Sequence, residues 1–215
     1  MTDPAALLTL TQWLSPAFPT GAFAYSHGLE RVVAEGKVTD AATLQAWLEG
    51  ILRHGAGWQD AVLLAVGLRD GADLAALDAL ARALAPSAER LRETLDQGQA
   101  FARTVSALTG RPQPPRALPV ALAEAAGSAA LTLPPATIIA LYLQGFAGNL
   151  VTIAVRHVPL GQTEGQRVLA RLAPLLAELA GWAGAATLDD LGGAAFAAEL
   201  AAFEHETQDI RIFRT

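Results

Sequence analysis

Two histidine–glutamate pairs are the residues of this sequence that could do acid–base chemistry. His205 and Glu206 are adjacent in the stretch "HETQD", and His27 precedes Glu30 by three positions. A histidine beside a carboxylate can move protons, but the pair needs a third group to orient the imidazole. A small α-helical enzyme that uses either pair therefore stays open as an alternative. The simpler interpretations are a polar helix end for the first pair and a surface i,i+3 pair for the second.

Other motifs for catalysis or metal binding are missing from the sequence. There is no cysteine, no G-x-x-x-x-G-K-[ST] phosphate loop and no G-x-S-x-G nucleophile turn. The stretch 205–209 matches only the first half of H-E-x-x-H, because Asp209 stands where the second histidine is needed. We therefore predict no catalytic residues, no resident cofactor and no metal site, and expect that the protein is not an enzyme.

Composition limits the class of protein further. The chain has 215 residues, of which 52% are hydrophobic and 17% charged, and its net charge is −6. The hydrophobic content excludes disorder, and the negative charge argues against nucleic acid as a partner. The first residues show neither a basic segment nor a long apolar one, so we expect no signal peptide and a cytoplasmic location. The low charged fraction and the many Ala- and Leu-rich helix faces predict a twofold homodimer.

The spacing of apolar residues is helical almost throughout, and the alternation typical of strands is nearly absent. We predict an all-α fold, a single-domain bundle of about eight to ten helices over residues 1–215. The first helix should begin at Asp3-Pro4, and the second should run unbroken from about Ala22 to Glu35. A third, capped by Thr39 or Asp40, should either continue through "WQDAVLLAVGLRD" or break at Gly55-Ala-Gly57. Later helices are expected at about 72–85, 87–110, 117–131, 135–157, 161–184 and 193–208.

One uncharged run leaves two interpretations open. No residue from Ala125 to Val155 is charged, and 18 of its residues, "IIALYLQGFAGNLVTIAV", are long enough to span a membrane. Pro134-Pro135, Gln144 and Asn149 argue against a membrane span. We favour a buried central helix of a globular domain, which must also be apolar all round.

Four segments carry unusual residues for a chain built mainly of Ala and Leu. They are "SPAFPTGAFAYSHGLE" at 15–30, "RETLDQG" at 92–98, "VPLGQTEGQRVL" at 158–169 and the terminal "HETQDIRIFRT". With these motifs in this order, the sequence resembles the UreF-type urease accessory proteins, and the resemblance covers essentially the whole chain. One departure is Asp209, where the family usually has an aromatic residue. A second is Thr215, where a final serine is commoner.

The resemblance implies an all-α fold that dimerises and has no catalytic activity of its own. Similar proteins work in nickel insertion into urease. They form a complex with a second accessory protein, UreD (also called UreH), and with the GTPase UreG, which brings the metal. The resemblance thus implies a scaffold that bridges a UreD/UreH-type protein and a UreG-type GTPase, reaches the urease apoprotein through that complex, and modulates GTP-dependent nickel insertion.

The partner-binding residues are expected in the unusual segments. Pro16, Pro19 and Gly21 set a helix–helix corner, whereas the polar tips of the Tyr25–His27 stretch are not needed by a corner and predict an exposed interface. The apolar tail residues could fold onto the chain's own core, but we favour a tail that orders on the UreD-type partner, with Phe213 filling a pocket there. The expected partner-binding residues are Tyr25, Ser26, His27, Glu30, Gln162, Gln166, His205, Glu206, Gln208, Arg211, Phe213 and Arg214.

Overall fold

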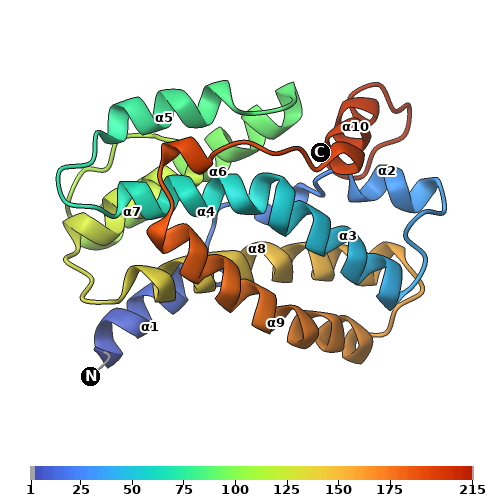
Figure 1. The fold of residues 1–215 in the computed structure, drawn as a ribbon, viewed down its shortest axis with the longest axis horizontal. Coiled ribbons are helices and arrows are strands. Elements are labelled where there is room, and N and C mark those ends of the chain that lie inside the picture. The colour runs from blue at the N-terminus through green and yellow to red at the C-terminus, as the bar shows by residue number, and fades with distance from the viewer. Residues whose placement is uncertain (1–2, 215) are drawn as a thin grey trace.

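The computed structural model describes residues 3–214, and the regular structure of this part of the chain is helical, without a strand (Figure 1). The predicted all-α fold class is confirmed. The α-helices are α1 (Pro4–Trp13), α2 (Leu29–Ala34), α3 (Ala41–His54), α4 (Ala56–Gly67), α5 (Leu74–Ala83), α6 (Ala88–Thr109), α7 (Leu118–Ser128), α8 (Pro135–His157), α9 (Gln162–Ala185) and α10 (Phe196–His205). Two short 3₁₀ helices are η1 (Ala22–Ala24) and η2 (Leu188–Asp190).

Helix α4 forms the centre of the fold. It packs against α3, α5, α7, α8 and α9, and the segment Ala61–Ala65 is buried on every side. It joins α3 at a sharp corner, where a side chain at Gly57 would come within 2.7 Å of the Leu52 backbone. Only glycine allows that approach. Of the two alternatives left open by the sequence, the structure shows the break at Gly55, which lets α3 and α4 cover the same pair of helices.

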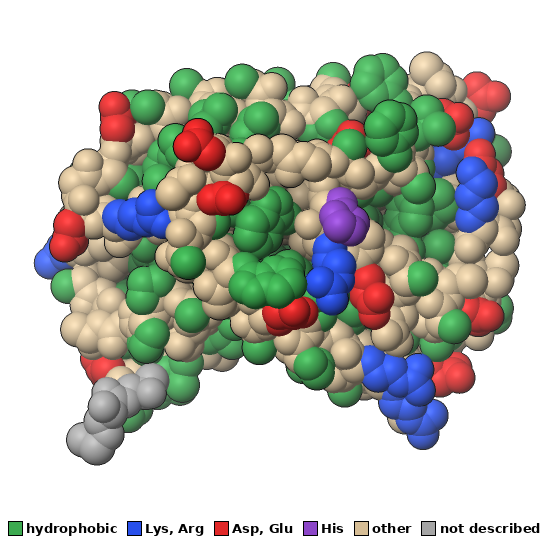
Figure 2. Space-filling model, viewed as in Figure 1, with side chains coloured by type: hydrophobic (Ala, Val, Ile, Leu, Met, Phe, Trp, Pro, Cys, Tyr) green, Lys and Arg blue, Asp and Glu red, His purple; other side chains and the backbone are tan. Residues whose placement is uncertain are grey.

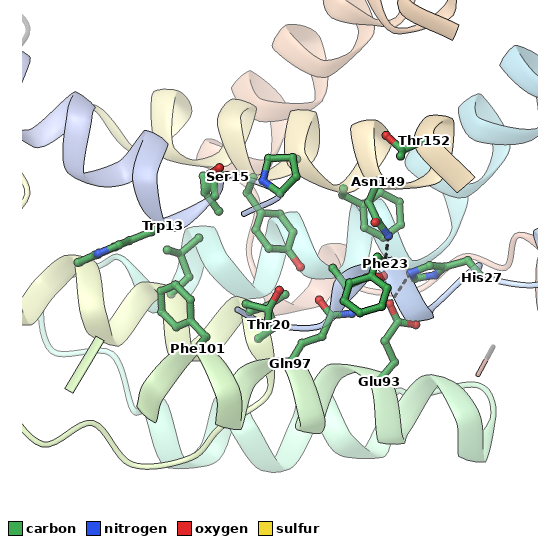
Figure 3. Close-up of a pocket in the computed structure, with 18 of the residues that line it drawn as sticks. Trp13, Ser15, Thr20, Phe23, His27, Glu93, Gln97, Phe101, Asn149 and Thr152 are labelled. Carbon is green, nitrogen blue, oxygen red and sulfur yellow. Dashed lines mark hydrogen bonds and ion pairs between the residues drawn. The ribbon is translucent and has the colours of Figure 1, made fainter. Parts of the chain in front are cut away.

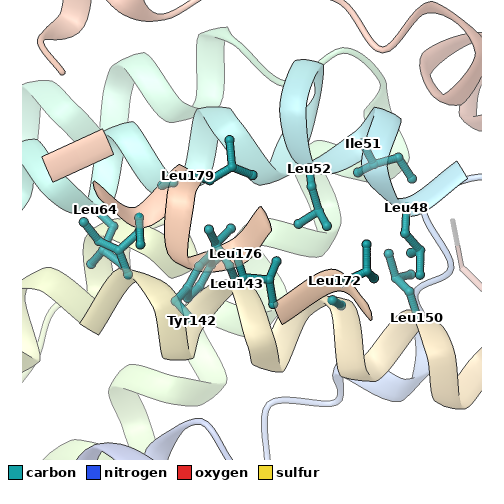
Figure 4. Packing of buried hydrophobic residues seen from close by; sticks show 14 of the residues in the cluster. Leu48, Ile51, Leu52, Leu64, Tyr142, Leu143, Leu150, Leu172, Leu176 and Leu179 are labelled. Carbon is teal, nitrogen blue, oxygen red and sulfur yellow. The ribbon is translucent and has the colours of Figure 1, made fainter. Parts of the chain in front are cut away.

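That pair is α8 and α9, which lie against each other and against α3 and α4 (Figure 1). Both are long and apolar enough to cross a membrane by length and composition alone, with 50% and 39% of the apolar window buried inside the fold. Leucines and isoleucines close the space between these helices (Figure 4). Helix α8 is thus only partly buried, and the segment buried on every side lies in α4 rather than in the uncharged run that we expected. The residues packed at this junction include Leu48, Ile51, Leu52, Leu143, Leu150, Leu172 and Leu176.

The predicted single helix from Ala22 to Glu35 is wrong. The chain forms η1, turns extended at Tyr25, and then passes through left-handed backbone at His27 (φ 53°) and Gly28 (φ 72°) before α2 begins. A side chain at Gly28 would lie 2.9 Å from the backbone nitrogen of Ala202 in α10. The close packing of α10 therefore requires this break, because a left-handed glycine accommodates both the turn and the contact.

Most other helix ends follow the caps expected from the sequence. The Asp3 side chain caps α1, and Asp40 forms a capping box with Thr43 at α3. Helix α10 is shorter than the predicted 193–208. It begins after Gly192 and Gly193, whose φ angles of 126° and 101° do not fit a helix, and it ends at His205.

Candidate functional site

The C-terminal tail is held by the carboxylate of Glu30, at the start of α2. Glu30 Oε1 accepts a hydrogen bond from the backbone nitrogen of Ile212 at 2.8 Å, and Oε2 accepts one from that of Phe213 at 2.9 Å. Oε2 also lies 3.0 Å from Nε2 of His205. Burial alone would raise the pKa of Glu30, but the hydrogen bonds from Phe213, His205 and Ile212 hold it below its ordinary value. The carboxylate thus fixes the tail through its backbone.

His205 joins the tail to a second carboxylate. Its side chain is fully buried, and its Nδ1 lies 2.8 Å from Oε2 of Glu89 in α6. The other oxygen of Glu89 lies 2.8 Å from Nη1 of Arg211. Glu206 accepts hydrogen bonds from the backbone nitrogens of Ala88 and Glu89, at the start of α6. Carboxylates are stabilised there because the first N–H groups of a helix have no partner within it. One network therefore connects α2, α6, the end of α10 and the tail.

The 15–30 segment meets the "RETLDQG" segment of α6. The Tyr25 hydroxyl donates to Oδ2 of Asp96 at 3.0 Å, and His27 Nε2 lies 2.8 Å from Oε1 of Glu93. Gln97 Nε2 donates to the same oxygen of Glu93 at 2.9 Å. These two motifs are far apart in the sequence and face each other in the fold (Figure 3). Desolvation alone would raise the pKa of Glu93, but the neighbouring His27 and Arg90 lower it.

A buried ion pair continues this cluster into the core. Arg90 Nη2 lies 2.9 Å from Oδ2 of Asp60, and the Tyr142 hydroxyl donates to the same oxygen at 2.7 Å. Burial, and then the charge of Asp60, raise the pKa of Tyr142 well above its ordinary value. Burial would lower the pKa of Arg90, but Asp60 and Glu93 raise it instead, so the guanidinium stays charged.

A cavity of about 330 Å³ opens beside the His27–Glu93 pair. Its walls come from the end of α1, the 15–27 segment and helices α6, α7 and α8, and Glu93 and Gln97 point toward it from α6 (Figure 3). The lining residues are Trp13, Leu14, Ser15, Pro16, Thr20, Ala22, Phe23, His27, Glu93, Gln97, Phe101, Leu118, Leu122, Tyr142, Gly145, Phe146, Asn149, Thr152 and Arg156.

Apolar side chains stand in solvent on α10 and the tail. Those on the helix recur at positions 196, 200 and 203, and are therefore on one face. We call this set the α10–tail patch; green side chains gather over α10 in Figure 2. Its members and their exposed fractions are Phe196 (81%), Leu200 (57%), Phe203 (58%), Ile210 (81%) and Ile212 (68%). Large apolar residues that cluster on a surface mark interaction sites.

The structure corrects our expectation that the polar tips of the 15–30 segment are exposed. Tyr25, Ser26 and His27 are buried, as are Glu30 and His205. Neither candidate acid–base pair forms as expected, because His27 faces Glu93 and not Glu30, while the Glu206 carboxylate bonds to the start of α6. The interpretation of His27 and Glu30 as a surface pair is wrong for the same reason.

Phe213 is a second correction. Its side chain is not free to fill a pocket on a partner, because it is buried in this chain's own core. Its ring centroid lies 4.8 Å from that of His157 at the end of α8. The neighbouring Arg214 is exposed, and its backbone nitrogen donates to the carbonyl oxygen of Ala24 at 2.7 Å. Thr215 lies outside the described residues.

The remaining expected partner-binding residues lie either in the tail network or away from it. Glu206 and Arg211 belong to the tail network, and half-buried Gln208 donates to the carbonyl oxygen of Ile210. Gln162 and Gln166 are exposed at the start of α9 and take no part in that network. Asp209 is also exposed. Within residues 3–214, no cluster of three or more His, Asp or Glu side chains could hold a metal ion.

Sequence reasoning missed the acidic side chains on α6 that receive these groups. Glu89, Glu93 and Asp96 each bond to a residue of the 15–30 segment or of the C-terminal end. The available signal was "RETLDQG" itself, in which Glu93 and Gln97 share a helix face. Their partners could not be identified without the fold.

The comparisons with known proteins decide the family. The UreF family model matches residues 38–173. The urease accessory protein UreF of Cereibacter sphaeroides (strain ATCC 17029) is 63% identical over 211 residues, which cover 98% of this chain and 99% of that protein.

The chain belongs to the UreF family. Its relatives in other genera extend the match: UreF of Paracoccus denitrificans is 56% identical over 215 residues, covering 100% of this chain and 99% of the relative, and UreF of Dinoroseobacter shibae is 49% identical over 211 residues, covering 98% and 99%. The UreF family model begins after the 15–30 segment and ends before the tail, but these longer matches include both. A UreF protein is a urease maturation factor, so the sites described above are to be understood as parts of an accessory protein.

Proposed function

We propose that this protein is a non-enzymatic scaffold that bridges a UreD/UreH-type accessory protein and a UreG-type GTPase, and so modulates GTP-dependent nickel insertion into the urease apoprotein. The single observation that carries the proposal is the α10–tail patch. Five large apolar side chains stand in solvent on one end of a chain whose family assists another enzyme. A maturation factor must bind other proteins, and an apolar patch with a polar rim is suited to that.

The tail network supports this assignment because it fixes the tail part of the patch. Glu30 and Glu89 fix the backbone and side chains around Ile212, so little conformational freedom is left to lose when a partner binds. Interfaces whose anchors are ordered in advance bind more tightly for the same contacts. In this proposal the buried polar residues of the site position the patch, and its exposed apolar residues make the contacts.

The division of labour follows from the residues that the sequence does not contain. A phosphate loop and cysteine thiolates are missing, so the nucleotide and tight nickel ligands would belong to partners. We propose a cytoplasmic location and a homodimer, with neither nucleic acid nor membrane as a partner. The alternative of a His/Glu enzyme has less support, because both ring nitrogens of buried His205 are occupied by carboxylates.

A pull-down with matched variants tests the proposal. Leu200→Asp removes an apolar contact from the patch, whereas Leu108→Asp changes a residue of α6 outside it with the same exposed fraction, 57%. We expect Leu200→Asp to weaken binding to the UreD-type partner by at least about tenfold, the equivalent of about 1.4 kcal/mol. Leu108→Asp should bind as the wild type does.

The same experiment, repeated with UreG, tests the bridge. UreG should be retained on immobilised UreD-type protein only when this chain is present, and GTP should change the amount retained. Equal binding by both variants would show that the patch is not the interface. Retention of UreG without this chain would contradict the bridging role.

A further inference from the structure

The 330 Å³ cavity is apolar on its walls and acidic at one end. Trp13 and Phe101 meet edge to face with ring centroids 5.9 Å apart, and Phe23, Tyr142 and Phe146 complete the aromatic lining. Cavities of this size, mostly apolar with a few converging polar groups, are typical ligand sites. No residue of the α10–tail patch lines it. The cavity is therefore a candidate site separate from that patch.

The acidic end has one oxygen without a donor. Glu93 is only 3% exposed, and its Oε1 is occupied by His27 and Gln97. Its Oε2 is buried and accepts no hydrogen bond from the described residues. The Arg90 guanidinium lies 3.7 Å away through Nη1, which is an ion pair but too long for a hydrogen bond. A buried carboxylate oxygen is costly without a donor, so this site is incomplete.

The charged side chains around Glu93 also bear on which ligand the cavity could bind. Asp60 and Glu93 supply two negative charges, and Arg90 supplies one positive charge through a guanidinium already bonded to Asp60 at 2.9 Å. His27 adds a positive charge only if it is protonated. A cation that enters the cavity would meet the Glu93 carboxylate, and Arg156, which also lines the cavity, adds one further positive charge to its wall.

We propose that this cavity binds the side chain of an arginine from a partner protein. A guanidinium offers several donors in one plane, stacks on aromatic rings and pairs with carboxylates. Its aliphatic stem matches the apolar walls, and its head can pair with the carboxylate of Glu93, which lines the cavity. Arg156 is exposed and lines the same cavity, so an acidic residue beside that arginine in the partner segment would pair with it. This inference depends on the proposed scaffold role only in taking the occupant from a protein.

An NMR titration of the intact wild-type protein tests the inference with matched probes. N-acetyl-arginine amide carries the proposed group, and N-acetyl-citrulline amide has the same shape without the charge. The chain has four tryptophans, of which only Trp13 lines the cavity. We expect the arginine probe to shift the Trp13 indole N–H resonance saturably, with a Kd at least about tenfold lower than that of the citrulline probe. The other indole resonances should not move.

A variant and a dilution series complete the design. Glu93→Gln keeps the shape of the side chain and should remove the preference for arginine over citrulline. Because the wild-type comparison needs no variant, the result stands even if Glu93→Gln folds poorly. Equal affinity for the two probes, or a shift confined to other tryptophans, would overturn the inference. A Trp13 shift that follows protein concentration alone would assign the cavity to a second copy of the chain and overturn it as well. None of these results depends on the α10–tail patch.

Discussion

Glu30 Oε2 and His205 Nε2 lie 3.0 Å apart although the two residues are separated by 175 positions. This contact brings together the last residue of the 15–30 motif and the first residue of the terminal "HETQDIRIFRT". The two motifs therefore form one structural unit rather than two sites. What distinguishes the unit is the number of groups that a single carboxylate serves: two backbone nitrogens of the tail and one imidazole.

Glu30→Gln should release the tail. The amide keeps the shape but has only one acceptor oxygen, so at least one of the buried tail nitrogens or His205 loses its partner. We expect a loss of about 1–3 kcal/mol in the free energy of unfolding and faster removal of the C-terminal residues by carboxypeptidase. Glu35→Gln, on the exposed end of the same helical segment, is the control and should leave both readouts near those of the wild type. An unchanged digestion rate for Glu30→Gln would show that the carboxylate does not hold the tail.

Phe213→Ala should destabilise the fold itself. The ring is 8% exposed and packs on His157, so its removal leaves a cavity that costs about 3 kcal/mol. The neighbouring Ile212 is 68% exposed, and Ile212→Ala should change stability by less than about 0.5 kcal/mol. Chemical denaturation of both variants measures the difference. Deleting residues 211–215 should therefore lower the melting temperature, which would not happen if the tail became ordered only on a partner. Equal stability of Phe213→Ala and Ile212→Ala would support the expectation that the tail becomes ordered on the partner.

Local signals in the sequence were enough to predict most of the fold. The aspartates that cap α1 and α3 and the glycines at the α3–α4 corner act on their immediate neighbours, so the helix boundaries there follow from the sequence alone. The Ala22–Glu35 prediction failed because the break at His27–Gly28 is imposed by α10, which packs there from the other end of the chain. Helical spacing cannot show such a contact.

The candidate site was predictable only as a set of motifs. The sequence marked Tyr25, His27 and His205 as unusual, and all three contact acidic side chains of α6. Their burial and their partners on α6 were not predictable, because the identity of a polar residue does not indicate whether its side chain faces solvent or a buried carboxylate. Only the tertiary fold shows whether such a residue is exposed or buried.

The isolated protein should neither bind nickel tightly nor hydrolyse GTP. Cysteine is missing from the sequence, and the imidazole nitrogens of buried His205 are already paired with glutamates. Isothermal titration with nickel should show no site of sub-micromolar affinity, and phosphate release from GTP should equal that of buffer. A sub-micromolar site in the purified protein would contradict the assignment of the metal to a partner.

The protein alone should form a twofold dimer. Phe23, Leu8 and Trp182 are exposed by 66%, 72% and 52%, and contact with a second copy of the chain would remove such apolar side chains from water. Light scattering at tens of micromolar should give twice the mass of 22.3 kDa. The Leu200→Asp variant should keep that mass if the dimer interface is separate from the α10–tail patch. A monomeric mass for the wild type would contradict this prediction.

Stability should fall in acid, with Glu93 among the groups responsible. The folded protein lowers the pKa of this carboxyl below its ordinary value of 4.5, through His27 and Arg90, against the opposing effect of burial. The ionised form is therefore favoured by folding. Its contribution is fully present above pH 4.5 and is lost as the pH falls from there through the lower pKa of the folded state.

Glu93→Gln should cost about 1–3 kcal/mol at pH 7, and the difference from the wild type should shrink steadily below pH 4.5. Urea unfolding at pH 7, 5, 4 and 3 measures it, with Asp209→Asn, an exposed carboxylate of the tail, as the control. A difference that stays constant across this range would show that the charge of Glu93 does not stabilise the fold, and that the variant acts only through shape.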